Sequence, residues 1–426
     1  MMKVKSRVIA AIDIGSEKIT TLIANFQTDL ADLSTTINII GVATSESGEG
    51  RGIRKGQIVN LEEAVESVVD SVESAERMAG YNISKAWVSI GGAHISSQNS
   101  HGVVAVLNPE GEISHDDIKR VIEAASAVSL PPTRTLLHII PKEYIVDGDN
   151  GIKDPLRMGG VRLETEAHLI TASSSAIKNI EKILDEVGIK VEGFVYSGIA
   201  ASDAVLTKTE KELGCVMIDI GGGTTSIAVY EEGALTYSYV LPIGSRNVTK
   251  DLATGLRVSL ESAEKIKLSL EDSNDKKSTE ENDQIDLSKF GIDEDKKVSK
   301  KTVVEGIIRP RLNEIFSMVK VQLEKERLIN KVPSGAIITG GGARVYSVED
   351  SGKRILGLPV RIGKPRGVTG LVDEILTPSF SVPIGILINA SKQEPKDHLT
   401  SISKRIKLPS IGIGNRLTKL FKDLLP

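Results

Sequence analysis

Hydrophobic and polar residues follow the same pattern at two places in the chain. Near residue 13 the sequence reads AAIDIGSEKITTLIA, and near residue 219 it reads VMIDIGGGTTSIAVY. In each copy a β-rich apolar run ends in Asp-Ile-Gly, and a few small or polar residues separate it from a second, alternating run. This pattern predicts a β-hairpin with Gly and hydroxyl residues at its tip. Because the copies lie 206 residues apart, they predict two similar domains rather than a solenoid.

Elsewhere the apolar positions recur at the spacing of amphipathic helices. Helices are predicted over 61–80, 115–128, 176–187, 252–270, 300–331 and 345–356. Short or alternating apolar runs predict strands over 86–90, 161–172 and 336–339. Because the stretch 85–165 contains its own strands and a helix, we expect it to be an inserted subdomain.

Three segments depart from these patterns. Residues 271–295 carry ten acidic and three basic side chains and few apolar ones, which predicts a mobile acidic loop. Residues 391–414 are polar and basic, as in a linker, and 415–426 form a separate amphipathic element. The remaining chain divides into two predicted domain cores and one further subdomain. The first core is 1–84 with 166–198, the second is 199–251 with 336–390, and the further subdomain is 252–335.

Composition excludes several classes of function. With 426 residues, 40% apolar and 26% charged, the chain has the balance of a soluble globular protein. The net charge is −4 and only 14 residues are aromatic, which argues against a nucleic-acid binder. The single cysteine excludes an internal disulfide. Asp13 interrupts the first apolar run too early for a signal peptide, and no run reaches the length of a transmembrane helix, so we expect a cytoplasmic protein.

The two hairpins have the chemistry of a phosphate site. Asp13 and Asp219 end apolar strands and face tips rich in backbone amides and hydroxyls, an arrangement that suits a magnesium-bound polyphosphate. Either hairpin alone would more often be an ordinary turn, whereas two in matched context favour the phosphate interpretation. The predicted tip residues are Gly15, Ser16, Glu17 and Lys18 in the first copy and Gly221, Gly222, Gly223 and Thr224 in the second.

A third glycine run, TGGGA at residues 339–343, follows a predicted strand. Alone it is a weak signal, but after two phosphate hairpins it predicts a loop beneath a nucleotide's sugar and base. The chain has no G-x-x-x-x-G-K-[ST] motif, which excludes a P-loop.

The order of these three loops resembles that of the actin–Hsp70–sugar-kinase superfamily. Within it, the chain closely resembles the bacterial FtsA family of cell-division proteins over about residues 8–390. The segments that carry this likeness are INIIGVA, RGIRKGQIVN, ERMAG, NSHGVVAV, HIIPKEYIVD, GGVRLE, IDIGGGTT and IITGGGA.

The resemblance implies an α/β fold of two duplicated, ribonuclease-H-like, actin-like domains with an inserted subdomain. It also implies that ATP and Mg²⁺ bind between the two lobes, with Asp13 and Asp219 holding the metal through water. Gly15, Ser16 and Lys18 fall on the family's first phosphate loop, and Gly222, Gly223 and Thr224 fall on the second. Gly341 and Gly342 fall on the base loop, and Glu264 and Lys267 match the pair that contacts ribose and base.

The same resemblance implies partners. The family forms actin-like filaments on the cytoplasmic face of the cell membrane at the division site, and it binds the C-terminal peptide of the tubulin-like protein FtsZ. We expect the FtsZ site in 252–335, with Lys297, Lys300 and Arg311 pairing with acidic groups of the peptide. A solvated helix face is the alternative interpretation of these bases.

Two positions depart from the family pattern. Ser197 stands where the family usually has a carboxylate that orients the attacking water, and Ser226 stands where an Asp is usual. Because a hydroxyl is a poor general base, we expect nucleotide binding but slow or absent hydrolysis.

The C-terminal element predicts membrane binding. On a helical wheel its apolar residues share one side, and basic residues with Asp423 take the other. The apolar residues are Leu417, Leu420, Phe421, Leu424 and Leu425, and the basic ones are Arg416, Lys419 and Lys422. At about 17 Å this helix could lie on an anionic membrane surface but not span it. A helix docked on the protein's own body is the alternative.

Two other functions share the superfamily fold. A sugar- or acetate-type phosphotransferase would need a second substrate pocket, for which the sequence offers no cluster. An Hsp70-like switch would need a large peptide-binding domain after residue 390, and a pilus-type ATPase would lack the basic C-terminal helix.

Overall fold

A computed structural model describes residues 4–29, 34–46, 51–108, 110–271, 283–291, 297–371 and 375–392. The predicted helix 415–426 and nearly all of the predicted linker lie outside these ranges. All elements described below fall within one unit, Met1–Ser391, apart from the last residue of the final helix.

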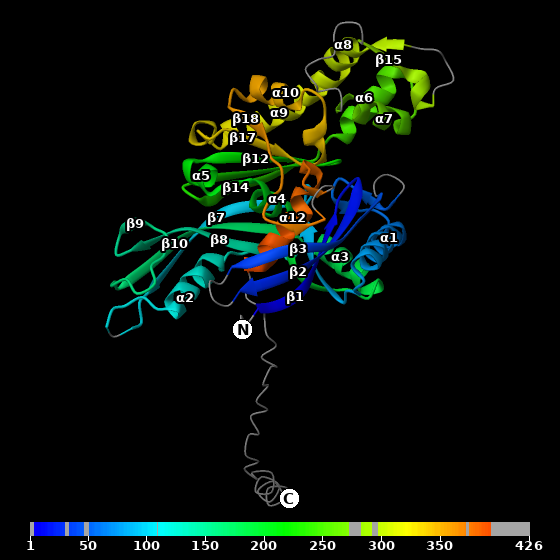
Figure 1. Ribbon diagram of the computed structural model, residues 1–426. Helices are drawn as coiled ribbons and strands as arrows, with labels where there is room; N and C mark the ends of the chain where they lie inside the picture. Colours follow the sequence, from blue (N-terminus) through cyan, green and yellow to red (C-terminus); the bar gives the residue numbers. More distant parts are fainter. Residues whose placement is uncertain are drawn as a thin grey trace, which may run out of the picture. The chain divides into compact units, whose positions relative to one another are not determined.

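The first repeat lies in a six-stranded sheet (Figure 1). Its order is β11-β6-β1-β2-β3-β19. Strands β1, β2 and β3 are antiparallel neighbours, β6 pairs in parallel with β1, and β11 pairs in parallel with β6. The strands are β1 (Val4–Ile14), β2 (Lys18–Asp29), β3 (Thr35–Glu46), β6 (Lys85–Ile90), β11 (Lys190–Tyr196) and β19 (Thr369–Gly370). Two short strands, β4 (Ile53–Arg54) and β5 (Gln57–Ile58), pair separately.

The second repeat lies in a sheet with the same connectivity. Its order is β14-β13-β12-β17-β18, and again three antiparallel strands are followed by two parallel ones. The strands are β12 (Cys215–Ile220), β13 (Thr225–Glu231), β14 (Ala234–Leu241), β17 (Ala336–Thr339) and β18 (Val360–Ile362). All six residues of β12 are buried, as expected for a central strand covered on both faces. The duplication that the sequence predicts is therefore present.

The insertion is a four-stranded antiparallel sheet with one helix on its face. The order β7-β10-β8-β9 is built from β7 (Ser96–Ala105), β8 (Arg134–Val146), β9 (Asp149–Ile152) and β10 (Arg162–Ser173). Helix α2 (His115–Ser126) packs so closely that a Cβ on Gly102 would lie 2.4 Å from the Val121 carbonyl oxygen. The predicted limits, 85 and 165, need correction: β6 pairs in the first sheet, and the insertion includes β10 as far as Ser173.

Outside the insertion, helices pack on the two repeated sheets and also make up much of the subdomain 252–335 (Figure 1). They are α1 (Leu61–Ala79), α3 (Ser174–Glu186), α4 (Ser197–Val205), α5 (Lys208–Leu213), α6 (Arg246–Leu256), α7 (Leu260–Glu271), α8 (Lys300–Val303), α9 (Arg309–Lys325), α10 (Val348–Leu356) and α12 (Ser381–Lys392). Helix α1 confirms the prediction over 61–80: the Asn60 side chain caps its start, and Gly80 ends it with φ of 63°.

Two helix predictions were wrong in detail. The stretch 252–270 is two helices, because Arg257 adopts a left-handed conformation with φ of 59° and ends α6. In 300–331 the chain stays helical from α8 through a π-helical turn, Val304–Ile308, into α9, with Pro310 just after this turn, as an interruption at Pro310 would predict; α9 ends at Lys325, before the expected end.

The acidic segment is not wholly a loop. Its residues Gln284–Asp286 form strand β15, which pairs with β16 (Lys297–Ser299), and Leu287–Phe290 form a 3₁₀ turn. Residues 272–282 and 292–296 lie outside the described ranges, so the expectation of a mobile loop applies to residues that the structure does not describe.

Polar contacts join the insertion to the second sheet. The Ser97 hydroxyl donates to the Ser238 carbonyl oxygen at 2.8 Å, and His168 Nε2 lies 3.1 Å from Ser238 Oγ. A further contact joins the insertion to the first sheet: His138 Nε2, on β8, accepts a hydrogen bond at 3.0 Å from the amide of Tyr196, the last residue of β11. Burial lowers the pKa of both histidines to about 4, so each is neutral near pH 7.

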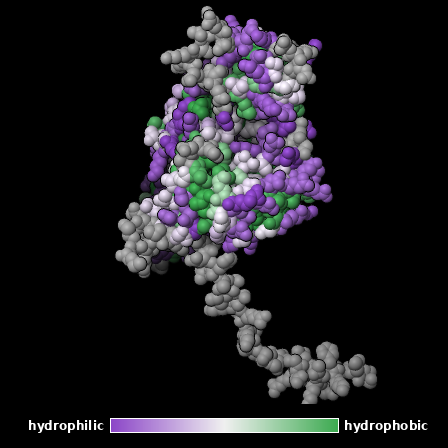
Figure 2. Space-filling model, turned by 45° about the vertical axis from the view of Figure 1, so that its right-hand side comes forward, coloured by the Kyte–Doolittle hydropathy of each residue, from purple (hydrophilic) through white to green (hydrophobic). Residues whose placement is uncertain are grey.

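Apolar side chains are mainly inside the two lobes. One core lies around the first sheet and includes Ile12, Leu22 and Val88, and the other lies between the second sheet and α9 and includes Ile218 and Phe316. On the face shown in Figure 2, hydrophilic residues cover most of the surface and hydrophobic ones gather in smaller areas. Within the described ranges, no helix is long and apolar enough to cross a membrane.

Replacing Gly385 with Ala should destabilise the fold. A Cβ there would lie 1.7 Å from the Ala200 carbonyl oxygen, so α12 and α4 would have to move apart. We expect a loss of about 1–3 kcal/mol in the free energy of unfolding, measured by urea denaturation. Gly306→Ala is the control, because nothing lies within 4 Å of its Cβ position. Equal stability of the two variants would contradict this packing.

Candidate functional site

A cavity of about 290 Å³ lies where the two hairpins meet. Its lining comes from both repeated sheets, from the glycine loop after β17, from α7 and from the segment before α12. It includes thirteen of the predicted site residues: Asp13, Gly15, Ser16, Glu17, Lys18, Ser197, Asp219, Gly221, Gly222, Thr224, Glu264, Lys267 and Gly341. Residues that are far apart in the sequence thus line a single cavity.

Two predicted glycines do not line this cavity. Gly342 is buried, and a Cβ on it would lie 2.3 Å from Ile220 Cγ2, so this glycine allows the loop to pack on β12. A Cβ on Gly223 would lie 2.8 Å from Ser16 Cβ, which places Gly223 at the contact between the two hairpin tips. Both positions therefore require glycine for close packing, and their expected contact with a ligand stays a prediction.

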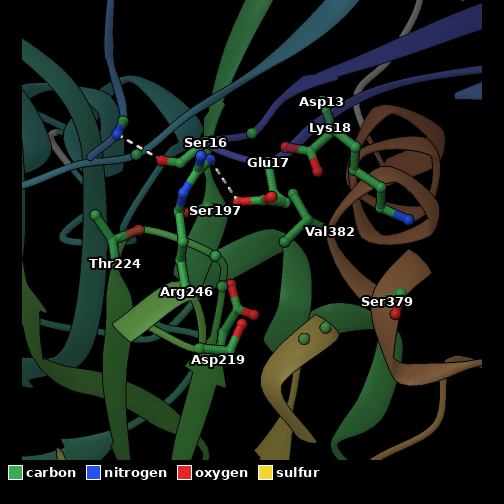
Figure 3. A pocket seen from close by; sticks show the side chains of 18 of the residues that line it. Asp13, Ser16, Glu17, Lys18, Ser197, Asp219, Thr224, Arg246, Ser379 and Val382 are labelled. Atoms are coloured by element: carbon green, nitrogen blue, oxygen red, sulfur yellow. Dashed lines mark hydrogen bonds and ion pairs between the residues drawn. The ribbon is translucent and has the colours of Figure 1, made fainter. Parts of the chain in front are cut away.

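The hairpin tips are closed by matching backbone bonds. The Gly15 amide donates to the Lys18 carbonyl oxygen at 3.1 Å, and the Gly221 amide donates to the Thr224 carbonyl oxygen at 2.9 Å. The Ser16 hydroxyl accepts from the Gly56 amide at 2.7 Å (Figure 3). The same turn chemistry therefore presents small and polar residues to the cavity from both lobes.

A cross-lobe ion pair lies at the edge of the cavity. Arg246 Nη1 lies 3.0 Å from Glu17 Oε2, joining the start of α6 to the first hairpin (Figure 3). Burial raises the pKa of Glu17, and Arg246 partly opposes that shift. The pair therefore ties the tip of the first hairpin to α6 of the second lobe through side chains.

Two carboxyl groups lie at the ends of the central strands. The Ser89 hydroxyl donates to Asp13 Oδ1 at 2.6 Å, and burial raises the pKa of Asp13. Burial, followed by the charge of Asp13, raises the pKa of Asp219 to about 7. Two desolvated carboxyl groups that repel one another favour either protonation of one of them or a bound cation.

The acid pair fits a hydrated magnesium ion better than a dedicated metal cage. Among the described residues, no group of three or more His, Cys, Asp or Glu side chains could hold a metal. Mg²⁺ is commonly held by one or two carboxylates together with waters and substrate phosphates. Asp13 and Asp219 are therefore suitable residues to hold Mg²⁺ that arrives with a polyphosphate.

Lys18 is half-buried beside this pair. Desolvation lowers the pKa of Lys18 to about 8, which Asp13 opposes and Arg344 reinforces. Its ammonium lies 4.1 Å from the centroid of the Phe380 ring. Lys18 therefore points from the first hairpin toward the segment before α12 (Figure 3).

Glu264 and Lys267 form a network at the opposite wall. Lys267 Nζ donates to Glu264 Oε2 at 2.7 Å and to Thr249 Oγ1 at 2.9 Å, and the Thr249 hydroxyl donates to Glu264 at 2.6 Å. Lys267 is buried although both charged residues line the cavity. The i,i+3 spacing on α7 thus produces an ion pair that also borders the cavity.

Ser197 begins α4 at the cavity wall. Its Oγ lies 3.4 Å from Ser226 Oγ, so the two departures from the family pattern are neighbours. Two hydroxyls therefore occupy the place where the resemblance leads one to expect two carboxylates.

Several lining residues escaped the sequence analysis. They lie in strands, helices and turns outside the predicted phosphate and base loops: Gly56, Ser89, Gly91, Ser245, Arg246, Arg344, Pro378, Ser379 and Val382. The Gly-Gly pair after the predicted strand 86–90 was a signal for Ser89 and Gly91. Ser379 and Val382 had no local signal, because only tertiary packing brings them to the cavity.

The predicted partner bases lie outside the cavity lining. Arg311 already pairs with Asp251 at 2.6 and 2.9 Å and also contacts Glu314. Lys300 Nζ lies 4.6 Å from the Tyr346 ring centroid, and Lys297 is exposed on β16. Because the Arg311 guanidinium is already paired, an available positive charge no longer supports its proposed role in binding a partner peptide.

The paired sheets, their shared strand order and the cavity between their hairpins define an actin-like protein. Two solved structures agree at the level of the fold. The PilM-PilN type IV pilus biogenesis complex matches with a TM-score of 0.63 and 14% identity over 90% of this chain and 99% of the other. MreB5 of Spiroplasma citri, bound to ADP, matches with a TM-score of 0.52 and 14% identity over 91% and 98%.

Sequence comparison identifies the family. The model "SHS2 domain inserted in FTSA" matches residues 92–171, and "Cell division protein FtsA" matches 216–385. Cell division protein FtsA of Borreliella burgdorferi is 36% identical over 94% of each chain, and that of Escherichia coli K12 is 32% identical over 99% of this chain and 98% of the other. The chain belongs to the FtsA family of cell-division proteins, which confirms the resemblance found in the sequence.

Asp219 should make the ligand-free protein lose stability as pH rises from about 4 to 7, against the opposite contribution of the buried, neutral His138 and His168. The raised pKa of Asp219 means that the folded state holds a proton that the unfolded state has lost, so folding is favoured at lower pH. In Asp219→Asn the fall should be smaller, by on the order of 1 kcal/mol or more, in calorimetry without Mg²⁺ or nucleotide. Identical pH dependence in both proteins would contradict the buried acid pair.

Proposed function

We propose that this protein binds ATP with Mg²⁺, assembles into actin-like filaments, and tethers FtsZ to the cytoplasmic face of the cell membrane at the division site. The observation that carries the proposal is the cavity in which two matching hairpins bring Asp13 and Asp219 together with Lys18. Membership of the FtsA family supports the role in cell division.

The chain's own groups have distinct tasks in this site. The hydroxyls of Ser16 and Thr224 and the glycine-rich tips suit the oxygens of a polyphosphate, because small residues let a ligand approach the backbone. Lys18 would neutralise phosphate charge. Bound Mg²⁺ would neutralise the phosphates as well as the two buried carboxylates that hold it. Glu264, Lys267 and Gly341 remain the proposed contacts of ribose and base.

Hydrolysis would be slow at best. A group that activates water needs a suitable pKa and hydrogen-bond reach, and Ser197 supplies only a hydroxyl beside Ser226. The MreB5 protein of similar fold has a structure bound to ADP, which supports a nucleotide in this cavity without supporting turnover. ATP is then mainly a ligand that joins the two lobes.

We retain the FtsZ peptide site in the subdomain 252–335. Lys297, on β16, is the exposed cation of the three proposed there. Arg311 is assigned a structural task instead, because its guanidinium already joins α9 to Asp251 of α6. An acidic peptide would therefore meet Lys297 and Lys300 before it met Arg311.

Gly341→Glu should prevent ATP binding. Gly341 is exposed at the cavity, and a Cβ there meets only Ser379 Oγ, at 3.8 Å, so the substitution adds a negative charge without disturbing the packing. A charged side chain in the space proposed for the ribose and base would be desolvated and unpaired by the ligand, and should weaken MgATP binding about 100-fold or more in isothermal titration calorimetry.

Gly306→Glu is the matched control, because it adds the same charge at an exposed position with nothing nearby. It should bind MgATP like the wild type. Affinity within threefold of the wild type for Gly341→Glu would show that the nucleotide does not occupy this cavity.

The proposed membrane contact is the segment 415–426. Apolar residues on one side and basic residues on the other suit the surface of an anionic membrane. One such short helix should bind weakly, whereas a filament that presents many should bind tightly through multivalency.

Leu420→Glu or Phe421→Glu should release the protein from anionic vesicles in a sedimentation assay. Each change places a charge on the apolar side, and most vesicle binding should be lost while MgATP affinity stays constant. Asn415→Glu is the control, because it makes the same charge change without removing an apolar side chain. Wild-type sedimentation of both apolar-side variants would exclude this segment as the anchor.

A further inference from the structure

One lysine of the cavity has an aromatic partner that the proposed function does not use. Lys18 Nζ lies 4.1 Å from the centroid of the half-buried Phe380 ring. Phe380 ends a 3₁₀ turn, Pro378–Phe380, whose middle residue, Ser379, lines the cavity. In Figure 3 the lysine extends away from Asp13 toward this segment.

The ring belongs to a segment that other contacts hold in place. The Gly340 amide donates to the Pro378 carbonyl oxygen at 3.1 Å. Directly after Phe380, the Ser381 hydroxyl lies 2.6 Å from that of Thr339, and α12 approaches α4 too closely for a Cβ at Gly385. Because backbone and buried groups fix the ring, the long side chain of Lys18 is the partner that can move.

A bound phosphate would compete with the ring for this ammonium. A cation over an aromatic face is favoured by a factor of about 2–30 in an equilibrium constant, and more when it is desolvated, as Lys18 is here. A lysine that turns toward a phosphate must first give up that contact. The ring contact therefore weakens nucleotide binding by the same factor.

We propose that Phe380 is a positioning residue that holds the Lys18 ammonium in a resting position outside the phosphate site, and that a nucleotide phosphate displaces it from the ring. This inference rests on the proposed function, because it concerns how the same cavity accepts ATP. It assigns to a residue with no sequence motif the task of setting the affinity for the nucleotide.

The test is a double-mutant cycle on MgATP affinity with the full chain, measured by calorimetry. Phe380→Leu should bind MgATP about 2–30-fold more tightly than the wild type, because the competing ring is gone. Phe380→Tyr keeps the aromatic face and should bind like the wild type. Lys18→Met should bind more weakly, and in that background Phe380→Leu should have no further effect.

Phe26→Leu is the matched control. It also removes a ring from under a cation, since Arg7 lies 5.5 Å from the Phe26 centroid, but Phe26 is absent from the cavity lining. It should leave MgATP affinity unchanged. Circular dichroism verifies that each variant folds, and Phe380→Ile repeats the test if Phe380→Leu does not.

The outcomes separate this inference from the proposed function. If the wild type binds MgATP but Phe380→Leu binds equally or more weakly, the inference is wrong and the nucleotide site stands. The same holds if the gain persists in the Lys18→Met background, because Phe380 would then act by another route. If the wild type does not bind MgATP at all, the proposed function fails together with the inference.

Discussion

The burial of two like charges is the constraint on which the rest of this structure depends. Asp13 and Asp219 end the central strands of two sheets, and both carboxyl groups are desolvated. Such a pair is unfavourable unless a proton or cation neutralises it. The structure keeps Asp219 buried and Asp13 half-buried all the same: Ser89 donates to Asp13, and the backbone at Gly340 passes so close to Asp219 that a Cβ there would lie 2.2 Å from its Oδ1.

The repeated sheet order explains how the two acids meet. In each lobe the hairpin strand that carries the acid is central, with antiparallel neighbours on one side and parallel strands on the other. The lobes are joined away from the cavity as well: β19, from the C-terminal part of the chain, pairs with β3, and the insertion contacts β14 through Ser238. These separate connections limit how far the lobes can part without breaking buried polar contacts.

Local patterns predicted the hairpins, their acids and most helices, because apolar periodicity and glycine turns act over a few residues. They failed where distant packing decides. Nothing near Arg257 signals that a non-glycine residue ends α6 in a left-handed conformation. The apolar run of β6 did not reveal that it pairs with β1 rather than with the insertion. Likewise, the TGGGA motif located its loop, but only the contact with Ile220 shows that Gly342 faces the sheet.

A cavity of this kind is suited to holding a ligand rather than consuming it. A contact crosses between the lobes beside it, from Arg246 to Glu17, and Ser197 supplies no strong base. Binding energy gained from a polyphosphate would therefore go mainly into fixing the lobes against one another. A subunit in a filament needs one fixed shape more than rapid turnover, because each interface must match the next. The hydroxyls at Ser197 and Ser226 are therefore compatible with the proposed nucleotide serving as a lasting part of the proposed filament.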